Sequence, residues 1–290
     1  MLFRLLLFAP QYKEHYLAKR QNFHASIQGF PELWNLYILL DKIILREFAD
    51  LTTGPDLKTL FPLFLYFEAH VKIRESMELA LSVCMPEARS ILRDGIEFVA
   101  HAHHMLKDPE LQKAWLSKND EAKAFAAAFE KNKKTGLFDG LEALHKKWGE
   151  LSETGAHATI NAVSQRYVQT QDEKGVNFRW NYCGLDSQAW ALEIFAMVLT
   201  FFEMEKTLYA DYEDRLKLDC ALLRMRQEFE VRKETFRRKL IQRFNLKPPP
   251  SPLIVNPRAA RVRRYRKPGE TEIKIIRVCC RFSLPPTTIG

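Results

Sequence analysis

Polar side chains able to bind an anion or move a proton recur along one side of the segment from Pro86 to Pro109. At about 100° per residue, a helix would place five of them together: Arg93, Asp94, Glu97, His101 and His104. An Arg guanidinium can hold a phosphate or a carboxylate, and a His side chain can exchange a proton near neutral pH. Such a set is compatible with a hydrolytic site.

Three interpretations of this polar side are open. The first is a solvated helix face on which Arg93 and Glu97 form an ion pair one turn apart. The second is a polar cluster in a groove between helices, where a buried Arg–carboxylate pair would need further partners. The third is a metal site built from Glu97, His101 and His104, but no HExxH or repeated ExxH pattern supports it. We favour the solvated face and predict no metal.

The segment has clear helix boundaries. Pro86 suits a first helical turn, Glu87 favours the positive end of the helix dipole, and Pro109 disfavours helical geometry at Asp108. The opposite side is apolar and should face a core; it carries Ile91, Gly95, Phe98, Val99, Ala102, Met105 and Leu106. The preceding segment, from about Asp56 to Val83, should form a helix that packs antiparallel to this one.

Ser152 and His157 are the second candidate region, near the start of a helix expected to extend to about Val168. We predict that Arg93 and Glu97 are linked to Ser152 or His157 in one interhelical polar cluster. Capping of a helix and a satisfied hydrogen bond between helices explain these residues more simply than catalysis does. The catalytic interpretation would use Arg93, Glu97 and His157.

The composition indicates an all-α bundle of six or seven helices. The 290 residues are 47% hydrophobic, which is ample for a core, and only 11 are glycine, which is few for a sandwich or a barrel. No phosphate-binding loop, dinucleotide fingerprint or nucleophile elbow is present, and we predict no cofactor. No apolar run approaches the roughly 18 residues of a membrane-spanning helix. Five cysteines without a framework spacing favour a reducing cytoplasm.

Other helices are expected over residues 31–50, 109–134, 136–149 and 186–244, with a short hairpin or ordered loop at 169–184. Residues 1–30 show no helical period, and we expect an irregular, buried start there rather than a signal peptide. We divide the chain into a helical core at 1–210, a projecting charged helix at 211–247 and a basic tail at 248–290, whose composition predicts disorder. The projecting helix could alternatively pair with another helix, including one from a second copy.

Charge is unevenly distributed along the chain. Residues 215–281 hold 20 Lys or Arg and 6 Asp or Glu, whereas residues 1–214 hold 24 and 30. The densest basic run has no acidic residue within it and consists of Arg258, Arg261, Arg263, Arg264, Tyr265, Arg266 and Lys267. Such a run suits salt-dependent binding to phosphates, with Tyr265 available to stack on a base. The pattern predicts an acidic partner, and nucleic acid fits it best.

Several of these motifs resemble those of a group of uncharacterised bacterial helical proteins. In that group, the second helix of a hairpin carries Arg-x-x-x-Glu and ends at a Lys/Asp-Pro sequence, and a later Ser-x-x-x-x-His lies near a helix start. The corresponding residues here are Arg93, Glu97, Lys107-Asp108-Pro109, Ser152 and His157. The resemblance covers roughly half of the chain. It implies a helical, bacterial protein and no particular activity.

A broader resemblance is to HEPN-type helical domains, many of which cleave RNA. Their signature is an Arg and a His separated by four to six residues. Seven residues separate Arg93 from His101, and three separate Arg20 from His24, so neither pair fits. The sequence therefore favours a non-catalytic protein that binds nucleic acid through its basic C-terminal arm. The alternative is a HEPN-like nuclease or other hydrolytic enzyme with a site around Arg93, Glu97 and His157.

Overall fold

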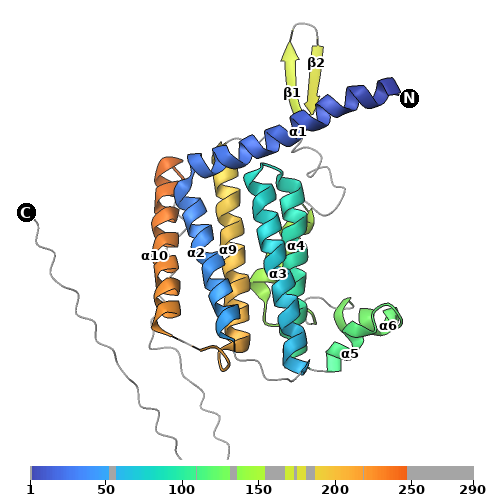
Figure 1. The fold of residues 1–290 in the computed structure, drawn as a ribbon, viewed down its shortest axis with the longest axis vertical. Coiled ribbons are helices and arrows are strands. Elements are labelled where there is room, and N and C mark those ends of the chain that lie inside the picture. Colours follow the sequence, from blue (N-terminus) through green and yellow to red (C-terminus); the bar gives the residue numbers. More distant parts are fainter. Residues whose placement is uncertain are drawn as a thin grey trace, which may run out of the picture. The chain divides into compact units, whose positions relative to one another are not determined.

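A computed structural model describes residues 2–51, 57–108, 110–130, 136–153, 167–172, 175–180, 187–217 and 219–246. Helices predominate in this part of the chain, which confirms the predicted all-α class. The five longest helices after the N-terminal one are α2 (Pro31–Asp50), α3 (Leu57–Leu81), α4 (Met85–Lys107), α9 (Ser187–Tyr212) and α10 (Cys220–Arg243). They stand side by side as a bundle (Figure 1).

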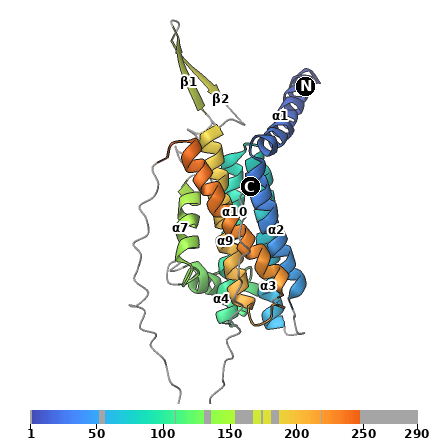
Figure 2. The ribbon, with the colours of Figure 1, turned by 90° about the vertical axis from the view of Figure 1, so that its left-hand side faces the viewer.

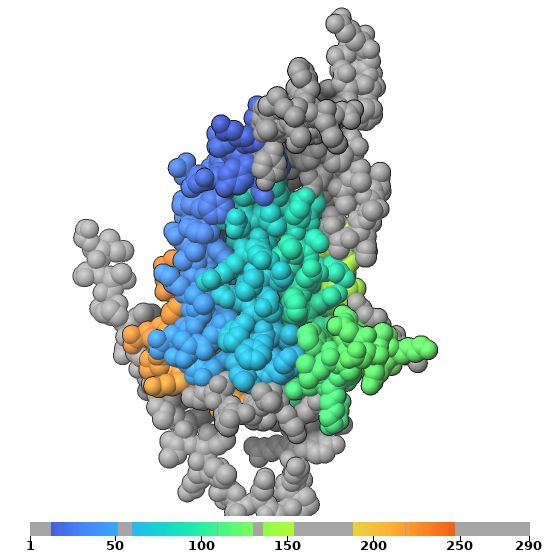
Figure 3. Space-filling view, turned by 45° about the vertical axis from the view of Figure 1, so that its right-hand side comes forward, coloured from blue at the N-terminus to red at the C-terminus, as the bar shows by residue number. Residues whose placement is uncertain are grey.

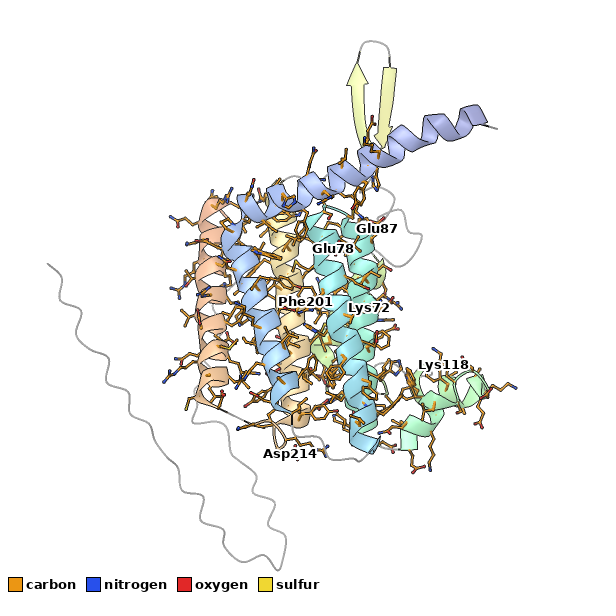
Figure 4. All side chains as sticks on the ribbon, viewed as in Figure 1. Lys72, Glu78, Glu87, Lys118, Phe201 and Asp214 are labelled. Atoms are coloured by element: carbon orange, nitrogen blue, oxygen red, sulfur yellow. The ribbon has the colours of Figure 1, made fainter. Side chains whose placement is uncertain are left out.

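The core forms where the apolar sides of these helices meet. In α2, the expected stripe is buried and consists of Leu33, Leu36, Tyr37, Leu40, Ile43 and Ile44. Tyr37 contacts Phe201 of α9, with ring centroids 6.2 Å apart. Phe201 is fully buried and lies inside the bundle, as Figure 4 shows. Burial of such apolar area is the main contribution to the stability of the fold.

The α3–α4 hairpin is the most closely packed part of the bundle. Gly95 allows this approach, because a Cβ atom there would lie 3.1 Å from Lys72 Cβ and 3.6 Å from the Ala69 carbonyl oxygen. The connecting turn has Val83 in the left-handed region, with φ of 61°. Two backbone bonds, Val83 N to Ala80 O and Cys84 N to Leu79 O, complete a Schellman-type helix end.

The single helix expected over residues 109–134 is wrong. The chain there forms three short pieces, α5 (Glu110–Leu116), α6 (Ala122–Phe125) and a π-helical turn, η1 (Ala126–Glu130). The interruption falls at residues 117–121, where the Asp120 and Glu121 amides bond to the Ser117 carbonyl in a turn. Helix α7 (Glu142–Leu151) follows and packs against α4 and α9 (Figure 2).

A β-hairpin occupies much of the segment for which we expected a hairpin or ordered loop. Strands β1 (Tyr167–Asp172) and β2 (Gly175–Trp180) pair antiparallel, with Tyr167 opposite Trp180 and Asp172 opposite Gly175. The hairpin therefore begins two residues before the predicted boundary, and Tyr167 and Val168 are in a strand rather than at the end of a helix. The alternation of aromatic and polar residues in β2 is the pattern that predicted it.

The N-terminal segment is a helix, so the expected irregular start is wrong. Helix α1 (Leu2–Gly29) lies across one end of the bundle and contacts α2 and α3 (Figure 1). Its residues are mostly good helix formers, but they lack a single apolar stripe because α1 meets the bundle at only part of its length. Tyr16 and Leu17, for example, are 52% and 44% exposed.

The long helix expected over 186–244 is divided, and its second half does not project. The chain turns at residues 213–219, and α10 runs back along α2. Asp219 caps α10 by accepting a hydrogen bond of 2.7 Å from the Leu222 amide. Docking buries the apolar side of α10, which carries Leu222, Phe229, Phe236 and Leu240. A projecting helix would leave these side chains in water, and residues up to Lys247 accordingly belong to the same compact unit.

No helix in the described part of the chain combines the length and the apolar character needed to cross a membrane.

Candidate functional site

The predicted contact between Arg93 of α4 and Ser152 is present. Arg93 Nε on α4 donates to Ser152 Oγ, just after α7, over 2.9 Å. Arg93 Nη2 donates to Glu97 Oε1 over 2.9 Å, and Arg93 Nη1 lies 3.3 Å from Asp94 Oδ1. The guanidinium therefore has partners in three directions. Because Arg93 and Glu97 are one helical turn apart, both side chains lie on the same side of α4.

Trp148 of α7 completes this group. Its indole Nε1 donates to Glu97 Oε1 over 2.8 Å, and the Arg93 guanidinium carbon lies 4.8 Å from the centre of its ring. Ser152 Oγ in turn donates to the Trp148 carbonyl over 2.8 Å. We call Arg93, Asp94, Glu97, Trp148 and Ser152 the Arg93 cluster. Its hydrogen bonds connect α4 to α7, and the Arg93 guanidinium lies over the face of the Trp148 indole.

The Arg93 cluster is partly buried rather than fully solvated. The side chains of Arg93 and Glu97 are 18% and 26% exposed. Burial, together with the nearby charge of Glu97, raises the pKa of Asp94 above its ordinary value. Of the three interpretations of the polar side, this geometry corresponds most closely to a polar cluster between helices.

The histidines predicted for the same site are elsewhere. His101 lies edge-on to Phe129 of η1, with ring centroids 4.8 Å apart, and His104 is 6.3 Å from the same ring. Both rings pack against the aromatic side chain of Phe129. Burial and the neighbouring His103 lower the pKa of His104. Among the described residues, no three His, Cys, Asp or Glu side chains are placed to hold a metal ion.

Other predicted site residues lie outside the described part of the chain. They are His157 and the basic run, which consists of Arg258, Arg261, Arg263, Arg264, Tyr265, Arg266 and Lys267.

A buried charge cluster inside the bundle was not predicted. Glu47 of α2 and Glu205 of α9 are 0% and 1% exposed, and both pair with Arg226 of α10, whose Nη1 is 2.7 Å from Glu47 Oε1. The Arg226 guanidinium also lies 3.8 Å from the centre of the Tyr209 ring. We call Glu47, Glu205 and Arg226 the Arg226 cluster. The sequence contains a signal for this cluster, because Glu47 and Arg226 occupy positions in the apolar stripes of α2 and α10 that are otherwise hydrophobic.

One cation is shared between two carboxyl groups in the Arg226 cluster. Burial, reinforced by the charge of Glu205, raises the pKa of Glu47 to about 10, and burial also raises the pKa of Glu205. At neutral pH, the pair therefore retains a proton, which avoids placing two negative charges in the core. The arrangement links α2 to the consecutive helices α9 and α10, which lie far from it in sequence.

Two histidine–aspartate pairs were also missed. His103 Nδ1 lies 2.7 Å from Asp211 Oδ1, and Tyr66 Oη donates to Asp211 Oδ2 over 2.5 Å. One turn along α3 from Tyr66, His70 Nε2 lies 2.7 Å from Asp41 Oδ1. These contacts span 29 to 145 residues. No spacing rule relates positions so far apart, so tertiary structure alone reveals them.

Comparison of the chain with protein-family models, with curated proteins and with solved structures gives no match.

Proposed function

We propose that this protein is a non-catalytic helical protein that binds nucleic acid through its basic C-terminal arm, residues 248–290. The observation that carries the proposal is the composition of the arm, which contains nine Lys or Arg and only two Glu. Arg side chains can hold phosphate oxygens with two parallel hydrogen bonds, and Tyr265 can stack on a base. Binding of this kind tolerates many sequences and weakens with salt.

The pairing of charges on α10 narrows the proposed binding segment. The cations of α10 are largely compensated by carboxylates nearby. Lys233 pairs with Glu230 at 2.5 Å, and Arg237 and Arg238 share Glu234 at 2.8 and 2.9 Å. Arg232 and Lys239 pair with Glu228 and Glu32. A phosphate would have to displace these carboxylates. The sequence after residue 247 holds nine Lys or Arg and only two Glu, so its cations are the better candidates.

Salt-dependent binding by the full-length protein tests the proposal. The six cations of the basic run would be changed together to Gln, which keeps the chain length and Tyr265. A fluorescent single-stranded oligonucleotide would be titrated at several salt concentrations. Each lost phosphate contact should reduce the log–log slope of affinity against salt by roughly 0.7–0.9. Deletion of residues 248–290 should have at least as large an effect.

A matched control removes exposed cations from α10 instead, by Arg232→Gln and Arg238→Gln. These side chains are 51% and 76% exposed but already paired, so affinity and slope should change little. Equal slopes for the natural chain and the arm variant would show that the arm does not contact phosphates.

The rival hypothesis, hydrolysis at Arg93, Glu97 and His157, has less support from the geometry. Every nitrogen of the Arg93 guanidinium has an acceptor within 3.3 Å, so binding a substrate anion would require breaking the contact between α4 and α7. His101 and His104 both pack on the Phe129 ring. We therefore assign the Arg93 cluster a structural role.

A further inference from the structure

A cavity of about 590 Å³ opens between α1, α2 and α3. This volume lies within the roughly 300–1,000 Å³ typical of small-molecule sites. We call it the α1 groove. Its lining consists of Tyr16, Lys19, Arg20, Phe23, His24, Trp34, Tyr37, Arg74, Met77, Glu78, Leu81 and Ser82. The surfaces of the three helices meet on the face shown in Figure 3, where α1 is dark blue, α2 is blue and α3 is cyan.

The walls of the α1 groove are held by contacts between elements. Ser26 Oγ of α1 donates to the Leu81 carbonyl at the end of α3 over 2.8 Å. Phe23 lies edge-on to Trp34 of α2, with ring centroids 6.2 Å apart. Trp34 in turn contacts Tyr37 at 5.6 Å. Helix α1 is thus fixed to both neighbours, and the cavity exists before any ligand enters.

Aromatic side chains supply much of the wall. Phe23, Trp34 and Tyr37 form a continuous series of rings from α1 to α2, and Tyr16 adds a half-exposed ring at the α1 side. Ring faces of this kind stack on planar aromatic ligands, including nucleobases, whatever the pattern of hydrogen bonds on the base.

Positive charge accompanies these rings. Lys19 and Arg20 come from α1 and Arg74 from α3, whereas Glu78 is the single acidic residue of the lining. Within the described part of the chain, neither Lys19 nor Arg20 forms an ion pair with a carboxylate, and Arg20 lies over the Tyr16 ring at 6.0 Å. Unpaired cations beside an opening attract an anion and need not release another partner to bind it.

Arg74 differs because its position is fixed. Its Nε and Nη2 donate to the two oxygens of Asp41, each over 2.8 Å, and His70 Nε2 lies 2.7 Å from the same carboxyl group. Burial opposes the charge of Asp41, but the hydrogen bonds from His70 and Arg74 outweigh it and lower the pKa of Asp41 to about 2. The remaining Arg74 nitrogen, Nη1, is left to bind an anion from a preorganised position.

We propose that the α1 groove binds a small ligand of the nucleotide class, in which an aromatic ring carries a phosphate. The ring stacks among Phe23, Trp34 and Tyr16, and the phosphate lies near Lys19, Arg20 and Arg74. This goes beyond the binding of nucleic acid by the arm and does not depend on it, because every lining residue belongs to the helical body.

The test is calorimetric titration of the full-length protein with AMP, adenosine and inorganic phosphate in parallel. AMP should bind, and adenosine and phosphate should each bind at least tenfold more weakly, because each offers only half of the chemistry. The variant Lys19→Gln/Arg20→Gln should weaken AMP binding at least tenfold while its melting temperature stays within about 2 °C. Lys13→Gln, an exposed cation on the same helix outside the groove, is the matched control and should bind AMP normally.

Three results would overturn the proposal. Absence of saturable AMP binding would contradict a nucleotide site in the groove. Equal affinity for AMP and phosphate would show that the aromatic wall does not contribute to binding. Normal AMP binding by the Lys19/Arg20 variant would move the site elsewhere. The variant with six Gln in the basic arm keeps the groove, so it should retain AMP binding. A 5′-phosphorylated oligonucleotide that competes with AMP in that variant would identify the end of a strand as the source of the nucleotide.

Discussion

Arg93 joins α4 to the end of α7 through donors that point in three directions. Ser152, Glu97 and Trp148 depend on one another in this arrangement, because Glu97 accepts from both Arg93 and Trp148. Removing one member of such a group leaves the others buried without a full set of partners. Loss of Arg93 would therefore destabilise the fold mainly through the polar groups that it leaves without a hydrogen-bond partner.

Arg93→Ala should lower the free energy of unfolding by about 1–3 kcal/mol. Ser152→Ala should lower it by about 1.5–3 kcal/mol, because the Arg93 guanidinium loses its acceptor and the Trp148 carbonyl loses the hydrogen bond that Ser152 Oγ donates. Chemical denaturation of both single variants and of the double variant would measure the coupling between them, which we expect to be 0.5 kcal/mol or more. Arg238→Ala, at a side chain that is 76% exposed, serves as the control and should change stability by less than about 0.5 kcal/mol. Purely additive losses would contradict a shared cluster.

The Arg226 cluster makes stability depend on pH. The folded pKa of Glu47, about 10, lies above its unfolded value. Between about pH 4.5 and pH 10, the folded chain thus holds a proton that the unfolded chain has released, and the free energy of unfolding falls as the pH rises. One such proton gives a slope of at most about 1.4 kcal/mol per pH unit.

Glu47→Gln should flatten this slope, because an amide is neutral at every pH and keeps nearly the same shape. Denaturation of the natural chain and of the variant at pH 6, 7.5 and 9 would compare them. We expect the variant to gain relative stability steadily toward pH 9. Glu228→Gln, on the exposed side of α10, should leave the slope unchanged. If Glu47→Gln and Glu228→Gln showed the same dependence of stability on pH, the titrating proton would not be on Glu47.

At the scale of elements, two glycines in helices have opposite surroundings. A Cβ atom at Gly95 would lie 3.1 Å from Lys72 Cβ on α3, whereas one at Gly149 would have no neighbour within 4 Å. Alanine is favoured over glycine in a helix by up to about 1 kcal/mol. The effect of Gly→Ala therefore depends on the space that the neighbouring helix leaves.

Gly149→Ala should raise the free energy of unfolding by roughly 0.5–1 kcal/mol. Gly95→Ala should lower it by about 1 kcal/mol or more, since Lys72 Cβ is attached to the α3 backbone and only a shift of the helix can relieve the contact. Thermal and urea denaturation would give both values. Stabilisation by Gly95→Ala would mean that α3 and α4 lie farther apart at Gly95 than the 3.1 Å contact with Lys72 Cβ implies.

The elements that the sequence predicted well are those with local signals. The α3–α4 hairpin follows from apolar periodicity and from Pro86, and β2 follows from alternation. Helix α1 was missed because it lacks a stripe. The turn at 213–219 was missed because it contains neither Gly nor Pro, although Asp219 is a typical N-cap residue.

The candidate sites divide in the same way. The Arg93–Glu97 pair is visible from helical spacing, and the resemblance indicated Ser152. The Arg226 cluster joins positions 179 residues apart, and the α1 groove depends on how α1 crosses the bundle end. Neither could be predicted, because each requires the packing of segments whose relative positions no local pattern fixes.

At the scale of the whole molecule, stability should be uneven. Helix α5 has seven residues, and Leu116 at its end is 64% exposed. The neighbouring Lys118 lies at the edge of the described body near α6 (Figure 4). In contrast, α4 is buried at nine positions along its length. Short helices with little buried area open more readily than core helices.

Amide hydrogen exchange should therefore show α5 exchanging by local opening, at least tenfold faster than the middle of α4. Exchange in α5 should be insensitive to low denaturant concentrations, while that in α4 should accelerate with denaturant as global unfolding does. Mass spectrometry of peptides covering 110–116 and 92–102 would resolve the two. Equal protection of both peptides would indicate that the described body unfolds as one cooperative unit.

Arg226 is the only member of its cluster that carries a positive charge, and it is the last of the three to be synthesised. During translation, Glu47 and Glu205 emerge first, and their partner follows 21 residues after Glu205. Until then, the nascent chain has no internal cation for the two carboxyl groups at this place. We expect the α3–α4 hairpin to form early on the ribosome, because its contacts are local, and α2 and α9 to close fully only when α10 arrives.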